Sequence, residues 1–423
     1  MRRMNNSDIK MNLDPLIYFI SNIMVAIIPL IMLPILTRVL SVEEFGQVAL
    51  FTTFNSVFVS LFGFGFIHSL TQKYFAHGHS EEEYRCVISA GIVVFLANFI
   101  VVLCLGSCYL YLATDYDESF WVIFYTSCIT AFVTNVINIR LNQWQIRRYA
   151  FRYGVLQVFL SLLNLTLTIV FVIIFLWGAK GRMISIMGAA IIIAFISIIY
   201  LRKDKLLTFR VSLVRVKEVY KYGFPLLPHF LAIFLISAAD KFVINSKLGI
   251  QELGIYAVSF QLASCLLLFY DSANKYLLPK LYSELSQNRN RSMVRDLYIY
   301  FMMIFFVSIV VITIGPNLIL LLTSATYLKG IDVFSILVVV HALGAMEQVF
   351  LNIILYNKLT KYVSAITIIS GVFNLIGLIV LTDSYGITGA AFALLITQII
   401  KLTLTFFIAN KFTPLPWFSI FKN

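Results

Sequence analysis

The sequence predicts an all-α polytopic membrane protein, and three observations lead to this prediction. The 423 residues are 60% hydrophobic and only 12% charged, whereas soluble domains are roughly half apolar and a quarter charged. The mean hydropathy is +0.91. Apolar stretches of about 20 residues, long enough to cross a bilayer, recur from end to end. A soluble fold of this length would need far more charge to cover its surface, so that class is excluded.

About 12 such stretches follow one another, and the connections between them are short. None of these connections resembles a soluble domain or a low-complexity linker. We expect transmembrane helices at roughly 16–36, 47–70, 87–112, 120–140, 153–177, 183–201, 223–245, 254–278, 298–323, 332–356, 362–382 and 387–410.

Lys and Arg are distributed unevenly between the two sets of alternate loops. Of the 32 such residues, 24 fall on one side, 5 on the other and 3 within spans. Cytoplasmic loops carry the excess of positive charge in membrane proteins. This bias predicts that both termini are cytoplasmic, and it explains the net charge of +12 without a nucleic-acid partner.

The two halves of the chain share a weak internal repeat. At an offset of 208, Leu40, Glu44, Gly46 and Ala49 match Leu248, Glu252, Gly254 and Ala257. At an offset of 210, Leu141-Asn142 and Asn164-Leu165 match Leu351-Asn352 and Asn374-Leu375. An even number of spans per repeat gives both halves the same orientation. We therefore expect two parallel six-helix lobes around a central cleft, an N-terminal lobe of residues 1–205 and a C-terminal lobe of residues 206–423.

Charged residues within the expected spans are the candidates for function, because a charge at bilayer depth usually faces a cavity or a partner. The seventh span contains Asp240 and Lys241. Adjacent helical residues point about 100° apart, so we expect that these two do not face one neighbour together and that Asp240 points into the cleft. Asp271 and Lys275 share a face of the eighth span, either towards the cleft or as an intrahelical ion pair.

Two further charges lie too deep to reach the membrane surface easily. Glu347 is near the middle of the tenth span and Lys401 is mid-span in the twelfth. Each is expected to face the cavity, or the two form a buried structural pair with each other. Arg38 closes the first span and Arg140 the fourth; the alternative for both is a surface charge at headgroup level.

No catalytic motif is present. The sequence has no Walker motif, no HExxH and no acidic pair in a large outer loop. The five cysteines form no CxxC pair, and we interpret them as small hydrophobic side chains. We therefore expect neither catalytic residues nor a metal or other cofactor, and we expect that the protein is not an enzyme.

Several segments resemble motifs of the polysaccharide (O-antigen) flippase family, which belongs to the multidrug/oligosaccharidyl-lipid/polysaccharide exporter superfamily. The resemblance spans nearly the whole chain, and its most specific part is the block at 240–257. The segments are 37–46 (TRVLSVEEFG), 62–65 (FGFG), 223–225 (GFP), 240–257 (DKFVINSKLGIQELGIYA) and 385–391 (YGITGAA).

The resemblance implies an alternating-access transporter in the bacterial inner membrane. It would move an undecaprenyl-diphosphate-linked oligosaccharide, an O-antigen or capsule repeat unit, from the cytoplasmic to the periplasmic leaflet. Its partners would be membrane lipids, a coupling proton or Na⁺, and a polymerase and chain-length regulator of the same pathway. A diphosphate needs cations in a low-dielectric site, so the substrate-binding candidates are Arg38, Arg140, Lys241, Lys275 and Lys401. Deep carboxylates suit ion coupling, and these candidates are Asp240, Asp271 and Glu347.

Three other functions remain open. A major-facilitator transporter normally carries a basic Gly/Asp/Arg motif in the loop between its second and third spans, and residues 71–85 lack it. A multidrug exporter of the same superfamily is closer. A membrane-embedded polysaccharide polymerase would need a sizeable outer loop with catalytic side chains, and the short outer loops argue against it.

Overall fold

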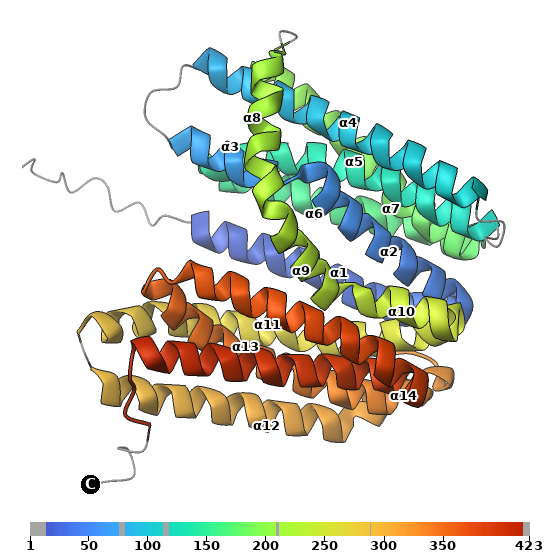
Figure 1. Cartoon of the computed structure of the whole chain (residues 1–423). Coiled ribbons are helices and arrows are strands. Elements are labelled where there is room, and N and C mark those ends of the chain that lie inside the picture. The colour runs from blue at the N-terminus through green and yellow to red at the C-terminus, as the bar shows by residue number, and fades with distance from the viewer. Residues whose placement is uncertain (1–13, 76–80, 113–117, 209–210, 288, 418–423) are drawn as a thin grey trace, which may run out of the picture. The chain divides into compact units, whose positions relative to one another are not determined.

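The computed structural model describes the chain except for residues 1–13, 76–80, 113–117, 209–210, 288 and 418–423. Every regular element in the described part is a helix (Figure 1). The predicted all-α class is therefore confirmed. By its internal contacts the chain divides into two compact units, one of residues 1–33 and 51–227 and the other of residues 34–50 and 228–423.

This division differs from the expected boundary at residue 205. Helix α8 (Leu213–Gly223) stays with the first unit because it packs against α3 and α4. Residues 34–50 form the end of α1 (Asp14–Val39) and the start of α2 (Val42–Gly63), and their contacts assign them to the second unit. The arrangement of two lobes around a cleft stays a prediction.

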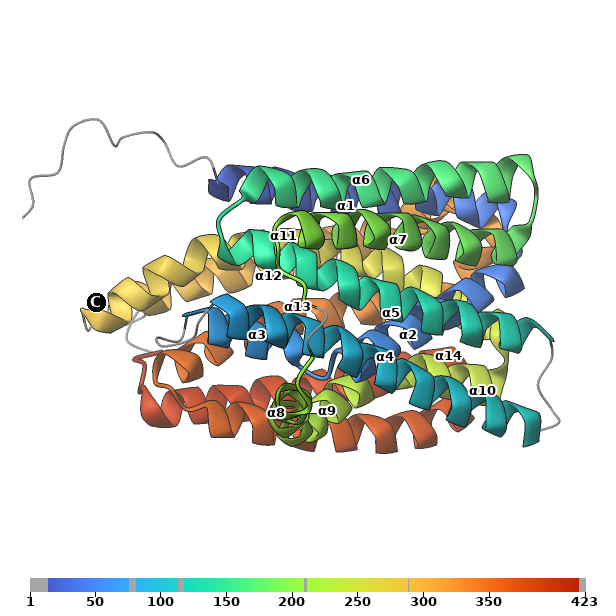
Figure 2. The same ribbon diagram turned by 90° about the horizontal axis from the view of Figure 1, so that it is seen from above.

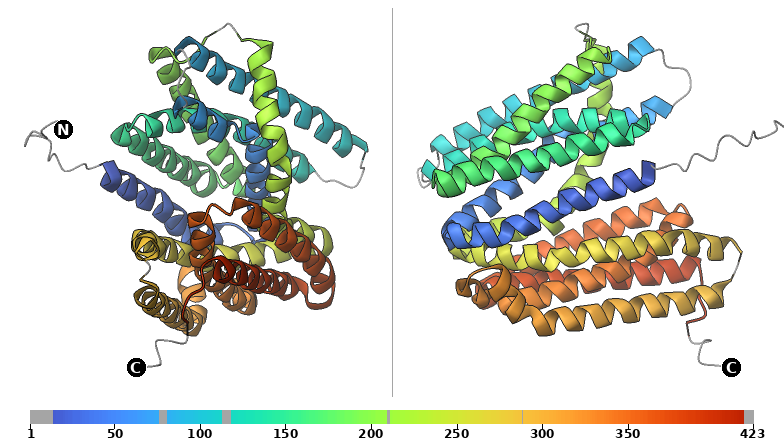
Figure 3. Two further views of the ribbon diagram at one scale, coloured as in Figure 1. Left: turned by 60° about the vertical axis from the view of Figure 1, so that its left-hand side comes forward. Right: turned by 180° about the vertical axis from the view of Figure 1, so that it is seen from behind.

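The first unit is a helical bundle in which the main contacts join consecutive and non-consecutive helices alike. α5 packs against α7, α6 against α7, and α8 crosses α4, as Figures 2 and 3 show. Besides most of α1 and α2 and all of α8, its elements are α3 (Phe66–Phe75), α4 (Glu81–Leu112), α5 (Glu118–Ile146), α6 (Ala150–Thr168), the π-helix Ile169–Ile174, α7 (Gly178–Lys203) and the 3₁₀-helix Phe224–Leu226.

The second unit is centred on α13, which packs against α11, α12 and α14 (Figure 1). Its elements are α9 (Leu227–Ser237), α10 (Ala239–Leu248), α11 (Ile250–Ser286), α12 (Asn290–Leu322), the 3₁₀-helix Ala325–Gly330, α13 (Ile331–Tyr356) and α14 (Thr360–Phe412).

Ten helices of the described residues are long and apolar enough to cross a membrane, compared with about 12 expected from the sequence. The difference has a local origin. α14 contains two of the expected spans, and it is interrupted at Gly386, whose φ of 59° is left-handed. The expected span at 223–245 is divided between α9 and α10, each too short to count alone. The span at 47–70 is interrupted at Phe64 and Gly65, which have positive φ, but α2 alone is long enough to be counted among the ten.

The internal repeat appears in the second unit as a symmetric helix contact. A Cβ on Gly46 would meet the carbonyl oxygen of Ile250, and a Cβ on Gly254 would meet that of Val42. The two glycines are 208 residues apart, and so are Val42 and Ile250, which is the offset found in the sequence. Glycine at both positions lets the two backbones approach closely, as small residues do between membrane helices.

The structure at the start of α2 accounts for Glu44, another residue of the internal repeat. The Ser41 backbone N–H donates to Glu44 Oε2 at 2.9 Å, and the Glu44 N–H donates to Ser41 Oγ at 3.1 Å. This is a capping box, in which two orphan N–H groups of the first turn are satisfied reciprocally.

Candidate functional site

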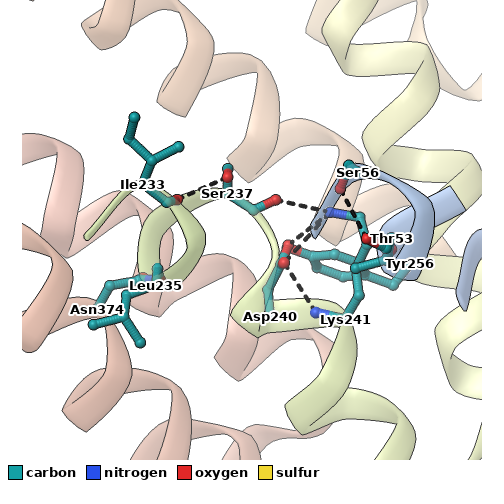
Figure 4. A network of polar contacts seen from close by, with 9 residues as sticks. All are labelled: Thr53, Ser56, Ile233, Leu235, Ser237, Asp240, Lys241, Tyr256 and Asn374. Carbon is teal, nitrogen blue, oxygen red and sulfur yellow. Dashed lines mark hydrogen bonds and ion pairs between the residues drawn. The ribbon is translucent and has the colours of Figure 1, made fainter. Parts of the chain in front are cut away.

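The break between α9 and α10 positions the two most prominent charged residues of the chain. Ala238 separates the two helices with φ −137° and ψ −23°. Asp240 therefore falls in the first turn of α10, where a carboxylate is favoured by the free N–H groups. Its side chain is 1% exposed. Its Oδ1 accepts from the Lys241 backbone N–H at 2.9 Å, and its Oδ2 accepts from the Tyr256 hydroxyl at 2.7 Å (Figure 4).

Lys241 turns its ammonium back towards the same break. Nζ lies 3.4 Å from Asp240 Oδ1 and donates to the Ser237 carbonyl at the end of α9, also at 3.4 Å. It lies 4.3 Å from the centre of the Phe260 ring, a cation–π contact. The side chain remains 14% exposed. Lys241 is thus the accessible member of the ion pair, while Asp240 is enclosed.

The expectation that Asp240 and Lys241 do not face one neighbour together is wrong. Asp240 contacts Tyr256 and Lys241 contacts Phe260, which are four residues apart on one face of α11. The expectation assumed a continuous helix through this segment. Because α10 begins only at Ala239, and the Lys241 stem is long enough to reach back, both side chains meet α11.

His341 of α13 lies beside this cluster. Its ring meets Phe260 edge to face at 5.6 Å. The residue is 9% exposed, and its Nε2 has no hydrogen-bond partner among the described residues. The Phe260 ring thus contacts both His341 and Lys241, which places the imidazole next to the charged cluster.

Glu347 and Lys401 form the second charged pair of the same unit. Lys401 Nζ lies 3.1 Å from Glu347 Oε2, joining α14 to α13. The Thr405 hydroxyl donates to Glu347 Oε1 at 3.2 Å and to the Lys401 carbonyl at 2.7 Å. Glu347 is 5% exposed and Lys401 25%. Of the two sequence alternatives, the geometry agrees with a pair, again with the lysine as the accessible member.

Arg38 is placed at the end of a neighbouring helix. It is exposed, and its Nη2 donates to the Leu321 carbonyl of the last turn of α12 at 3.0 Å. Thr37 donates to the next carbonyl, that of Leu322, at 3.4 Å. A cation at a helix C-terminus satisfies orphan carbonyls and complements the helix dipole. Arg38 therefore has a structural contact that accounts for it.

Arg140 is the one expected site residue that lies in the first unit. It is fully buried, and Nη2 is 2.6 Å from Asp204 Oδ2. Its Cζ lies 4.1 Å above the Trp144 ring. Of the alternatives considered from the sequence, a surface charge does not agree with this geometry, because the side chain is buried against Trp144 and Asp204.

Asp271 and Lys275 are both exposed on α11. Within the described part of the chain they form no ion pair with each other. The structure therefore does not bring these two into either of the compact pairs above.

Sequence reasoning missed Arg182, which it counted as a loop residue. In the structure it lies in the first turn of α7, and Nη1 donates to Asn164 Oδ1 at 2.7 Å and to the Thr168 hydroxyl. It has no carboxylate partner among the described residues. The signal available in the sequence was Asn164, which belongs to the internal repeat.

These charges are arranged as separate pairs. No group of three or more His, Cys, Asp and Glu side chains in the described residues is placed to hold a metal ion. The second unit thus offers two similar ion pairs on helices, one of them at a helix break. Discontinuous helices of this kind hold substrates and coupling ions in transporters.

Comparison with solved structures identifies the class as a multi-pass membrane transporter fold. The chain superimposes on a structure titled "Lipid II flippase MurJ, inward closed conformation" with a TM-score of 0.75 and 15% identity, covering 94% of this chain and 87% of that one. An inward-facing multidrug resistance MATE family transporter of the MOP superfamily gives a TM-score of 0.69 and 14% identity, covering 93% and 94%. At these identities the likeness concerns the fold.

The particular family follows from the sequence. The chain belongs to the polysaccharide biosynthesis protein family, whose pattern matches residues 14–283. A protein of Haemophilus influenzae (strain Rd), described as "Uncharacterized membrane protein", is 25% identical over 380 residues, covering 88% of this chain and 90% of that protein. The resemblance seen in the sequence motifs is therefore confirmed.

Proposed function

We propose that the protein is a flippase for a lipid-linked oligosaccharide, an O-antigen or capsule repeat unit attached to undecaprenyl diphosphate. It would act in the bacterial inner membrane, with both termini cytoplasmic, and move its cargo from the cytoplasmic to the periplasmic leaflet. The observation that carries the proposal is the Lys241 ammonium, 14% exposed at the break between α9 and α10, in a chain of the polysaccharide biosynthesis family. A polymerase and a chain-length regulator would use the product.

The proposed mechanism couples cargo to an ion through the Asp240–Lys241 pair. A diphosphate arriving at Lys241 competes with Asp240 for the ammonium, because both are anions. Asp240 then keeps only the Tyr256 hydroxyl and the Lys241 backbone N–H as partners. A buried carboxylate that loses its counter-ion takes up a proton or Na⁺. Substrate binding and ion loading are thereby linked, and an ion gradient supplies the energy.

Complementation of a deletion strain tests this function. Surface glycan and membrane protein level are measured together, and the leaflet in which lipid-linked repeat units accumulate is determined. Loss of the protein should abolish surface glycan and trap single repeat units in the cytoplasmic leaflet. Trapping in the periplasmic leaflet would instead indicate a polymerase, and unchanged glycan would remove the protein from the pathway.

Variants of α10 test the site. Lys241→Ala and Asp240→Asn should reduce surface glycan at least tenfold at normal abundance, and Lys241→Arg should restore part of it. Lys247→Ala is the matched control, since Lys247 lies on the same helix but is engaged with Asp383 at 2.6 Å. Full activity with the proton and Na⁺ gradients both collapsed would refute ion coupling.

The MATE-like fold supports a second candidate, a multidrug exporter of the same superfamily. This function predicts that deletion sensitises cells to cationic drugs and leaves surface glycan unchanged. The partly exposed cations, Lys241 and Lys401, favour an anionic cargo instead.

A further inference from the structure

A second site lies in the first unit, apart from the ion pairs of the second. A pocket of about 590 Å³ is lined by residues from the end of α5, the start of α6 and the end of α7. Figure 2 shows these three helix ends at the same end of the bundle. Its size is within the range of small-molecule sites. α6 and α7 are packed side by side, so the first turn of α6 and the last turn of α7 share one end of the bundle.

The mouth of this pocket is cationic. Arg152 and Lys203 line it, both are exposed, and neither forms an ion pair within the described residues. Each holds its charge near an aromatic ring: Arg152 Cζ is 5.1 Å from the centre of Tyr149, and Lys203 Nζ is 5.9 Å from that of Tyr200. The carboxylate that lines the pocket, Asp204, is engaged by Arg140 at 2.6 Å. The available charge is therefore positive.

The inner wall offers a buried donor that lacks an acceptor. Trp144 lines the pocket and is 2% exposed, yet its Nε1–H has no hydrogen-bond partner among the described residues. Its ring is held between the Arg140 guanidinium, 4.1 Å away, and the Tyr200 ring, 5.4 Å away. Nε and Nη1 of Arg140 are buried without partners as well. A buried N–H without a partner is costly, so a ligand that brings acceptor oxygens would be stabilised here.

An apolar stripe leads away from these charges along α6. Val155 and Phe159 are 52% and 45% exposed, and they follow Arg152 at spacings of three and seven residues, on one face of the helix. The stripe extends about 10 Å from Arg152, at 1.5 Å per residue. Ile196 of α7 lines the same wall. A phosphate alone would leave this surface uncovered, whereas a lipid would cover it with an acyl chain.

We propose that this pocket binds an anionic phospholipid of the surrounding membrane. Its phosphate lies between Arg152 and Lys203 and accepts from the Trp144 indole, and one acyl chain lies along Val155 and Phe159. Basic pockets between membrane helices recognise such headgroups, because their Lys and Arg side chains attract the anionic phosphate. The site is independent of the proposed transport function.

Native mass spectrometry of the purified full-length protein tests the proposal. Phosphatidylglycerol and phosphatidylcholine with identical acyl chains are titrated separately, and retained adducts and the thermal midpoint are recorded. We expect phosphatidylglycerol to bind at least tenfold more tightly and to raise the midpoint. Equal binding of the two lipids would overturn the proposal.

Three variants localise the binding. Arg152→Gln with Lys203→Gln should weaken phosphatidylglycerol binding at least tenfold, whereas Arg202→Gln with Lys205→Gln, an equal loss of charge outside the pocket lining, should change it less than twofold. Trp144→Phe replaces the indole by a smaller aromatic ring that has no N–H, and it should weaken binding several-fold. Equal losses in both double variants would mean that charge attracts lipid without a site, and would refute the pocket.

Two competitors separate the possible sources of the phosphate group. Inorganic phosphate at millimolar concentration should not displace the phospholipid, because it leaves the apolar stripe uncovered. Polyprenyl diphosphate at equal concentration should not displace it either. Displacement by polyprenyl diphosphate alone would assign the pocket to the transported lipid and contradict the proposal, as would displacement by inorganic phosphate.

Discussion

The Glu347–Lys401 pair provides a quantitative stability prediction. The charged atoms are 3.1 Å apart, with the carboxylate 5% exposed and the lysine 25% exposed. At this separation the Coulomb attraction is about 5 kcal/mol for an effective dielectric constant of about 20. Much of it is offset by desolvation of the two groups. Removing one partner leaves the other desolvated and unpaired, so single substitutions should cost more than the double substitution.

We expect Lys401→Met to lower the free energy of unfolding by about 3 kcal/mol, the lower end for breaking a buried pair, because a quarter of the lysine side chain is exposed. Glu347→Gln should cost about 1–2 kcal/mol, since the amide oxygen still accepts from Thr405 and Lys401 extends towards its exposed side. The double variant should lie within about 1 kcal/mol of the natural protein, which gives a coupling energy of at least about 3 kcal/mol.

The assay is unfolding of the four purified proteins in the same detergent, followed by tryptophan fluorescence at one scan rate, because thermal unfolding depends on rate when it is irreversible. The exposed pair Lys247–Asp383, at 2.6 Å with side chains 26% and 62% exposed, is the matched control. The same cycle there should give a coupling below about 1 kcal/mol. Additive losses at Glu347 and Lys401 would refute the argument from desolvation.

Three further predictions concern other parts of the molecule. The Lys73 ammonium, 2.6 Å away, lowers the pKa of the Glu218 carboxyl below its ordinary value of 4.5. The ionised carboxylate therefore stabilises the fold above pH 4.5, and this contribution is lost as the pH falls through the pKa of the folded state. The stability difference between the natural protein and Glu218→Gln should vanish in acid. Gly46→Ala and Gly254→Ala should each cost about 1–3 kcal/mol in thermal unfolding, whereas Gly344→Ala, with its nearest atom at 3.7 Å, should cost nothing. A reporter that acts only in the periplasm should be inactive when fused to the C-terminal residue, and activity there would contradict the charge bias.

Composition and periodicity were sufficient to predict the all-α class and the approximate position of most spans. They also located the internal repeat, because Gly46 and Gly254 are constrained by a close backbone contact that tolerates no side chain. Hydropathy misses helix interruptions. The break at Ala238, between α9 and α10, falls inside the single span expected at 223–245, because it arises in the backbone of an apolar residue and leaves the apolar pattern unchanged. The break at Gly386 lies instead between the spans expected at 362–382 and 387–410, where the polar residues Asp383 and Ser384 mark it in the sequence.

The site was less predictable for the same reason. The sequence identified Asp240, Lys241, Glu347 and Lys401 as costly charges, which depends only on their depth in apolar stretches. It gave no partner for Asp240, because the Tyr256 contact depends on how α10 meets α11. Burial and partners are set by tertiary packing, which a linear pattern does not contain.

The Asp240–Lys241 and Glu347–Lys401 pairs share an asymmetry that bears on transport. In each, the carboxylate is enclosed, 1% and 5% exposed, while the lysine is 14% and 25% exposed. An anion that approaches such a pair reaches the cation first, and by competing for it leaves the carboxylate without its counter-ion. In the reverse arrangement, an exposed carboxylate would repel the diphosphate before it reached the lysine. The proposed exchange therefore requires this order of burial, and Lys241→Ala should uncouple the two events by leaving Asp240 permanently loaded with a proton or Na⁺.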